Sequence, residues 1–316
     1  MDVRGLVDPA YKGAMEEMAK RPADWSDPAA VRASRKVLFP PPPVPDGVEW
    51  QDHTAPGPDG APGVLVRTYR PVNATAALPC IYWIHGGGYM AGSYDGSNNT
   101  CGKWALDFQC TVASVEYRLA PEHPYPAPLE DCYVGLQWLI GNAAGLGVDP
   151  ARVLIAGASA GGGLCAALAL LVRDRSELSI THQLLIYPMI DDRRTTESSK
   201  WTTYVWTTSS NETGWKSYLG PLPGGDVPLY AAPARATDLK GLPPAFVMVG
   251  TLDLFLDEDV AYANRLMHAG VPTELHVYAG GPHGFDSPMV GGNAELGRRA
   301  RRDVDEWLAR ALAGPA

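Results

Sequence analysis

One serine of the chain, Ser159, stands in the pattern Gly-x-Ser-x-Gly within the segment RVLIAGASAGGGLCAALALLV (152–172). An apolar run precedes it and an Ala/Leu-rich run follows, which is the strand–turn–helix context that exposes a nucleophilic serine on a strained turn. The amino end of such a helix favours the negative charge that develops during acyl transfer. Ser159 is therefore the candidate nucleophile. The alternative is a small-residue turn with an N-capping serine.

A serine hydroxyl needs a base to become a nucleophile, and in sites built on this turn the acid and the histidine follow the serine along the chain. Three histidines precede Ser159 and are excluded by that order, namely His53, His85 and His123. His268 is placed near the end of a predicted helix, and His276 is placed within a predicted strand. His283, in GGPHGFD, follows a predicted strand, where ligands gather in open α/β sheets. We predict His283 as the base.

The acid has two candidates that follow predicted strands. Asp253 follows the run PAFVMVG (244–250), and Asp191 follows QLLIYP (183–188). Three further carboxylates start the next predicted helix and suit its dipole, namely Asp257, Glu258 and Asp259. We predict Asp253 as the acid, with Asp191 as the alternative.

Three consecutive glycines follow the apolar run CIYWIH in the segment IHGGGYMAGS (84–93). A loop without Cβ atoms can direct backbone N–H groups at an oxyanion without obstruction from side chains. We predict the N–H groups of Gly87, Gly88 and Ala160 as the oxyanion donors. His85 is expected to orient this loop, and a tight turn alone would need only one or two glycines.

Alternating strand-like and helical patterns predict the α/β class, with a mostly parallel sheet buried on both faces. The expected strands are 63–70, 80–85, 111–117, 152–158, 183–188, 244–250 and 273–279, and the expected helices are 9–20, 97–108, 128–142, 160–174, 257–269 and 293–312. The proline run FPPPPVP (39–45) separates a front segment, 1–45, from a core that comprises 46–192 and 226–316.

The interval 193–225 interrupts this alternation and is expected to form an inserted cap. Its aromatic residues are Trp201, Trp206, Trp215 and Tyr218. They either line a substrate pocket or pack the cap. The two cap pieces are short and lack a long apolar surface, which favours soluble esters with short acyl chains over lipid emulsions.

Composition excludes several classes of protein. The formal net charge of −9 argues against nucleic acid or an anionic membrane surface as the main partner, and 46% hydrophobic residues indicate a globular protein. Five cysteines form no CxxC pair, so we expect reduced core thiols rather than a metal site, with a disulfide pair as the alternative. The amino end carries no apolar leader pattern, and no window is long enough to span a membrane, so we expect a cytoplasmic protein.

Taken together, the motifs resemble those of the hormone-sensitive-lipase family of α/β-hydrolases, in its bacterial esterase branch. The matching segments, in the family's order, are HGGGYMAGS, EYRLAPEHPYPAPLED, GASAGG, YPMID, GWKSYLG, the Asp253 segment and HGF. The resemblance implies the α/β-hydrolase fold, a cap formed by the front helices and the insertion, and hydrolysis of small carboxylic esters without a cofactor. It also implies Ser159, Asp253 and His283 as catalytic residues, with oxyanion donors at Gly87, Gly88 and Ala160.

Two positions depart from the family's pattern. The acid segment reads Asp253-Leu254-Phe255 where relatives often have Asp-Pro-Leu, and Ala158 stands where they often have Asp or Thr. Two other functions are compatible with the fold: an amidase or peptidase with the same triad, and a ligand receptor without activity. The run TELHVYA (273–279) comes last among the predicted strands and is expected at a sheet edge, where a second copy can pair in a homodimer.

Overall fold

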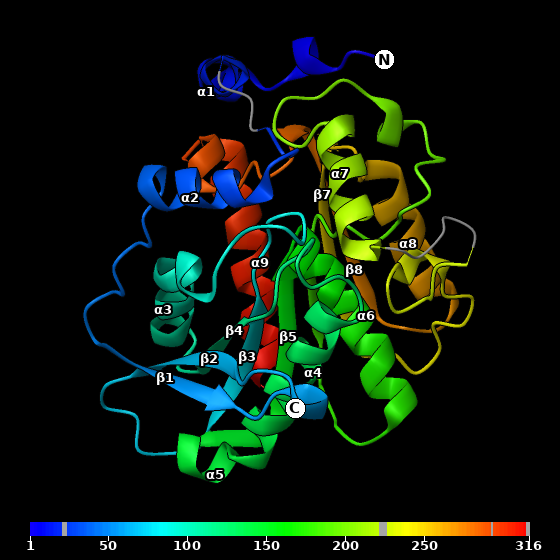
Figure 1. Ribbon diagram of the computed structural model, residues 1–316. Helices are drawn as coiled ribbons and strands as arrows, with labels where there is room; N and C mark the ends of the chain where they lie inside the picture. The colour runs from blue at the N-terminus through cyan, green and yellow to red at the C-terminus, as the bar shows by residue number, and fades with distance from the viewer. Residues whose placement is uncertain (21–23, 221–225, 292, 314–316) are drawn as a thin grey trace.

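In the computed structural model, which describes residues 1–20, 24–220, 226–291 and 293–313, eight strands form one sheet at the centre of the molecule (Figure 1). The strands are β1 (Val48–Ala55), β2 (Val64–Pro71), β3 (Leu78–Ile84), β4 (Thr111–Glu116), β5 (Val148–Ala158), β6 (Gln183–Ile186), β7 (Ala245–Leu252) and β8 (Thr273–Pro282). They lie in the order β1-β2-β4-β3-β5-β6-β7-β8. From β4 to β8 all neighbours are parallel, which confirms the predicted mostly parallel α/β sheet.

Helices cover both faces of the sheet, so the strands are apolar at successive positions. On β5, Val153 and Ile155 belong to the core shared with α4, α6 and α8, whereas Leu154 and Ala156 belong to the core shared with α3 and α9. Adjacent side chains point to opposite faces of a strand, which explains the continuous apolar runs of the sequence. The helices of the core are α3 (Asn98–Asp107), α4 (Ala127–Gly141), α5 (Ala143–Leu146), α6 (Ala160–Arg175), α8 (Leu256–His268) and α9 (Glu295–Ala313).

Three more helices, α1 (Pro9–Ala19), α2 (Pro28–Leu38) and α7 (Thr208–Leu219), lie at the end of the sheet where the parallel strands terminate (Figure 1). The side chains of Asp8 and Asp27 cap α1 and α2, each ahead of a proline in the first turn, and Thr207 caps α7. Short 3-10 helices occupy Arg4–Leu6, Pro58–Gly60, Tyr94–Ser97, Ser198–Lys200, Pro233–Arg235 and Pro288–Val290.

Three helices, α2, α5 and α7, and one strand, β1, have no counterpart among the expected residue ranges. The sequence analysis gave no range for α2, although Asp27-Pro28 is a helix-start signal. It also predicted no strand at β1, which pairs antiparallel with β2 and is largely exposed at the sheet edge, so its side chains show little apolar pattern. The boundaries 1–45 and 193–225 of the expected cap remain predictions, and their residues 21–23 and 221–225, like 292 and 314–316 of the core, lie outside the described residues.

No helix in the described part of the chain combines the length and the apolar character needed to cross a membrane.

Candidate active site

Ser159 occupies the turn between β5 and α6 in a conformation that side chains rarely adopt, with φ of 56° and ψ of −122°. The two glycines of the motif permit this turn. A Cβ atom at Gly157 would lie 2.2 Å from the carbonyl oxygen of Gly161, and one at Gly161 would lie 2.1 Å from the carbonyl oxygen of Ile84. Both positions of the motif therefore require glycine, because a side chain at either one would prevent the close packing of this turn, which lies against β3.

The structure brings the three predicted catalytic residues together. Ser159 Oγ lies 2.9 Å from His283 Nε2, and His283 Nδ1 lies 2.6 Å from Asp253 Oδ2. The serine follows β5, the aspartate follows β7 and the histidine follows β8, so the carboxyl ends of three parallel strands supply the set. His283 is buried between the rings of Tyr187 and Phe255, which meet its imidazole at centroid distances of 4.8 and 5.2 Å.

Asp253 is fully buried, and its second oxygen Oδ1 accepts a hydrogen bond from the N–H of Phe255 at 3.1 Å. The carboxylate is thus oriented from both sides by N–H groups. Leu254, between Asp253 and Phe255 in the chain, is the residue that departs from the family's Asp-Pro-Leu pattern, and its side chain is fully buried. This departure from the family pattern leaves the contact between Asp253 and His283 intact.

The alternative acid and one alternative histidine have other partners, and the other histidine lies at the end of a helix. Asp191 accepts two hydrogen bonds from the guanidinium of Arg193, at 2.8 and 2.7 Å. His276 lies within β8 and contacts Glu274 at 2.9 Å, and His268 is the last residue of α8. The geometry favours Asp253 and His283 over each of these candidates.

The glycine loop lies directly beside Ser159. A Cβ atom at Gly86 would lie 2.7 Å from the carbonyl oxygen of Ala158 and 3.2 Å from Ser159 Cβ, a close approach that the sequence analysis did not assign to this residue. Gly87 and Gly88 have φ of 131° and 63°, so their backbone favours glycine. Within the described residues, the N–H groups of Gly87, Gly88 and Ala160 donate no hydrogen bond. These donors are available to a ligand.

His85 supports the loop as predicted and is not a candidate base. Its ring stacks on Tyr117 at a centroid distance of 4.2 Å, and its Nδ1 donates to the carbonyl oxygen of Gly86 at 2.9 Å. Burial lowers the pKa of His85 to about 4, so the imidazole is neutral. The nearby Glu116, 3.8 Å from His85 Nε2, has its pKa raised to about 7, also by burial.

The N-terminal segment holds the same loop from outside. Arg32 of α2 donates to the carbonyl oxygen of Met90 at 2.9 Å and forms an ion pair with Glu122. Arg118, four residues before Glu122 in the chain, binds Asp131 through two hydrogen bonds of 2.8 and 2.7 Å. The segment around Glu122 thus braces the loop through Arg32, a contact that no sequence pattern indicated.

The aromatic residues of the insertion have three different environments. Trp215 and Tyr218 of α7 are buried against Tyr89, with ring centroids 5.4 and 3.9 Å apart, and therefore pack the core. Trp206 instead lies 6.4 Å from the ring of His283 and against Gly88. Trp201 is half-buried and packs against both cores.

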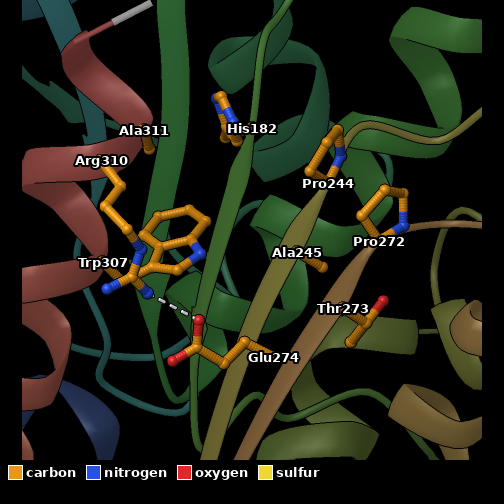
Figure 2. A pocket seen from close by; sticks show the side chains of 9 residues that line it. All are labelled: His182, Pro244, Ala245, Pro272, Thr273, Glu274, Trp307, Arg310 and Ala311. Atoms are coloured by element: carbon orange, nitrogen blue, oxygen red, sulfur yellow. Dashed lines mark hydrogen bonds and ion pairs between the residues drawn. The ribbon is translucent and has the colours of Figure 1, made fainter. Parts of the chain in front are cut away.

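A separate cavity of about 420 Å³ lies at the opposite end of the sheet, where β7 and β8 begin (Figure 2). Its lining comprises His182, Pro244, Ala245, Pro272, Thr273, Glu274, Trp307, Arg310 and Ala311. Figure 2 shows the ion pair between Arg310 and Glu274 at its edge. The residues that line this cavity do not include Ser159, Asp253 or His283, so the cavity is separate from the candidate active site.

Comparisons with known proteins agree with this geometry. The family model described as alpha/beta hydrolase fold matches residues 81–287, a range that includes Ser159, Asp253 and His283. The carboxylesterase NlhH of Mycobacterium tuberculosis is 34% identical over 284 residues and 88% of each chain. Esterase LipI of the same organism is 32% identical over 304 residues, which are 90% of this chain and 89% of LipI.

Solved structures agree over almost the whole chain. A bacterial heroin esterase superimposes with a TM-score of 0.93 at 36% identity, covering 98% of this chain and 99% of the other. The hyperthermophilic esterase from the archaeon Pyrobaculum calidifontis superimposes with a TM-score of 0.86 at 30% identity, with the same coverage. From the fold, the motifs and these matches, the chain belongs to the α/β hydrolase fold family, in its hormone-sensitive-lipase-like esterase branch.

Proposed function

We propose that this protein is a serine carboxylesterase that hydrolyses soluble esters with short acyl chains through an acyl-enzyme on Ser159. The observation that carries the proposal is the hydrogen-bonded chain from Asp253 through His283 to Ser159, beside a loop with unused N–H groups. The names of the similar proteins, a carboxylesterase and several esterases, support the same reaction class.

The first half of the reaction forms the acyl-enzyme. His283 Nε2 accepts the hydroxyl proton as Ser159 Oγ attacks the ester carbonyl carbon. The carbonyl oxygen becomes an oxyanion, and the N–H groups of Gly87, Gly88 and Ala160 donate to it. His283 then gives its proton to the alkoxy oxygen, the bond from carbon to this oxygen breaks, and the alcohol leaves with the acyl group bound to Ser159.

The second half repeats these steps with water as the nucleophile. His283 accepts a proton from water, the hydroxide attacks the acyl carbon, and the proton returns to Ser159 Oγ as the carboxylic acid leaves. Asp253 accepts from His283 Nδ1–H throughout, which holds the ring orientation and stabilises the imidazolium. No cofactor takes part in this scheme.

Covalent labelling tests the nucleophile. A fluorophosphonate should label the native protein, and peptide mapping should place the label on Ser159. The variant Ser159→Ala should lose both the label and ester turnover, whereas Ser209→Ala, an exposed serine of α7, should keep both. A label on another serine, or turnover by Ser159→Ala within tenfold of the native rate, would refute the proposed nucleophile.

The substrate range follows from the covering of the site. The helices at the strand ends are short, with 11 residues in α1, 11 in α2 and 12 in α7, which supports a small cap rather than the extended apolar lid of an interfacial lipase. We expect kcat/KM for p-nitrophenyl esters to peak among short acyl chains, with little turnover of emulsified triglyceride. A rate that rises steadily to long chains and increases above the solubility limit would make the protein a lipase. Matched anilides would reveal amidase activity.

The proposal extends to location and assembly. The five cysteines are free and buried, which supports a reducing, cytoplasmic environment, and the net charge of −9 supports a small-molecule partner rather than nucleic acid. We also propose a homodimer that pairs along β8, the last strand of the sheet, where Val277 is 45% exposed. Sedimentation should show a dimer that Val277→Lys weakens, and a native monomer at micromolar concentration would refute it.

A further inference from the structure

Trp206 lies over the reacting end of the candidate site. A Cβ atom at Gly88 would lie 2.2 Å from Trp206 Cη2, so the edge of the indole rests on this glycine. The same ring system lies 6.4 Å from the imidazole of His283, with 37° between the planes. The indole therefore extends from the oxyanion loop to the base, on the side from which the insertion covers the site.

The surroundings of Trp206 hold the indole in one place. Its Nε1 donates to Asn211 Oδ1 at 3.1 Å, and Asn211 is itself only 1% exposed. Thr203 Oγ1 donates to the Trp206 carbonyl oxygen at 2.7 Å. Trp25, from the N-terminal segment, meets the indole edge-on at a centroid distance of 5.7 Å. Because both cap pieces fix this side chain, it acts as a rigid wall rather than as an adjustable one.

The position of this wall has a consequence for substrates. An ester whose carbonyl oxygen is bound by the N–H of Gly88, and whose carbon is within reach of Ser159 Oγ, lies beside the indole. The groups attached to that carbon must fit in the space that Trp206 leaves. Hydrophobic pockets discriminate by about 10- to 200-fold for each methylene that fits or does not fit.

We propose that Trp206 determines acyl-chain specificity by setting the upper size of the acyl group that the site accepts. The inference rests on the proposed esterase function and deepens it, because it assigns the short-chain preference to one side chain. Removal of the indole should open space for longer acyl chains. Phenylalanine, which lacks the second ring and the bond to Asn211, should open part of that space.

The test compares Trp206→Ala and Trp206→Phe with the native enzyme. A matched control is Trp50→Ala, because Trp50 lies on β1 and is 51% exposed. Fluorophosphonate titration gives the concentration of active sites, and kcat/KM is measured for p-nitrophenyl acetate, butyrate and octanoate. The octanoate-to-acetate ratio should rise at least tenfold in Trp206→Ala and by less in Trp206→Phe. It should stay within twofold in Trp50→Ala.

A second substrate series separates the acyl group from the alcohol. Acetate esters of alcohols of increasing length should show the same profile in the native enzyme and in both Trp206 variants. An unchanged octanoate-to-acetate ratio in a Trp206→Phe variant with native melting temperature would overturn the inference, as would a shift confined to the alcohol series. The proposed function fails differently: native protein that is not labelled on Ser159 contradicts the esterase mechanism, whatever the Trp206 variants do.

Discussion

At the scale of single residues, hydrogen-bond partners distinguish side chains with the same chemistry. Asp253 and Asp191 both follow a strand of the parallel sheet and both are buried. Asp253 accepts from His283, whereas Asp191 is occupied by Arg193. A carboxylate bound by a guanidinium on both oxygens is not free to orient an imidazole. The two aspartates are therefore a matched pair for mutation.

Asp253→Asn should lower kcat/KM for a short p-nitrophenyl ester by on the order of 10⁴-fold, because the amide no longer holds the required tautomer of His283. Asp191→Asn should lower it by less than tenfold. Steady-state kinetics of the two variants at equal active-site concentration decide the matter. A larger loss in Asp191→Asn would show that the acid is wrongly assigned.

Gly88→Ala should reduce kcat by on the order of a hundredfold or more while KM changes little, because an oxyanion donor acts mainly in the transition state. The new Cβ meets Trp206 at 2.2 Å, and φ of 63° disfavours a side chain, so the N–H must move. Gly96→Ala is the control, since its Cβ would meet only Ser93 Oγ, at 3.6 Å. Both variants must have the circular dichroism spectrum of the native protein. A fully active Gly88→Ala variant would show that the glycines only form the turn and that Gly88 is not an oxyanion donor.

At the scale of elements, the glycine loop is held from two directions. The buried His85 ring fixes Gly86 from within, and Arg32 of α2 fixes Met90 from outside. Helix α2 is thus joined to the catalytic core at the glycine loop, which bears the predicted oxyanion donors Gly87 and Gly88. Met90 also donates its N–H to Gly87 O at 3.2 Å, which links the arginine contact to the donor residues.

Arg32→Met should lower kcat several-fold with a smaller change in KM, because the loop loses a charge-assisted hydrogen bond, worth about 1.5–3 kcal/mol when intact. Arg32→Lys should retain part of the rate. Glu122→Gln removes the ion pair but leaves the bond to Met90, so its kcat should stay near native. Equal losses in Arg32→Met and Glu122→Gln would indicate that the ion pair, rather than the contact with the loop, matters.

At the scale of the whole molecule, the buried His85 and the partly buried Glu116 beside it affect stability as a function of pH. The pKa of His85 falls to about 4 in the folded state from an ordinary value of 6.5, because burial disfavours the charged ring. Its contribution to stability is present above pH 6.5 and is lost as pH falls towards 4. The raised pKa of Glu116, about 7 against 4.5, has the opposite sign: stability is lost as pH rises from 4.5 to 7.

The free energy of unfolding of His85→Gln should therefore fall less on acidification than that of the native protein, by up to about 3 kcal/mol between pH 6.5 and pH 4. Glu116→Gln should show the opposite difference, a smaller loss as pH rises from 4.5 to 7. Urea unfolding at a series of pH values measures both curves. Parallel curves for the native protein and His85→Gln would contradict a neutral, buried His85.

Local patterns of the chain alone determined the α/β class, most strand and helix positions, and the candidates Ser159, Asp253, His283 and the glycine loop. Periodicity and glycine spacing are properties of short segments, so they can be read without the fold. The largely exposed edge strand β1 lacked such a pattern and was missed. The helix α2 was overlooked although its starting signal is present.

The tertiary structure alone decided which residues from distant segments meet. It placed Arg32 on the carbonyl of Met90, and Trp206 rather than Trp215 over Gly88. These choices depend on the strand order, the path of the insertion and the way the N-terminal helices cover the strand ends. Each is a contact between segments far apart in sequence, set by packing of the whole molecule, for which no local pattern carries a signal.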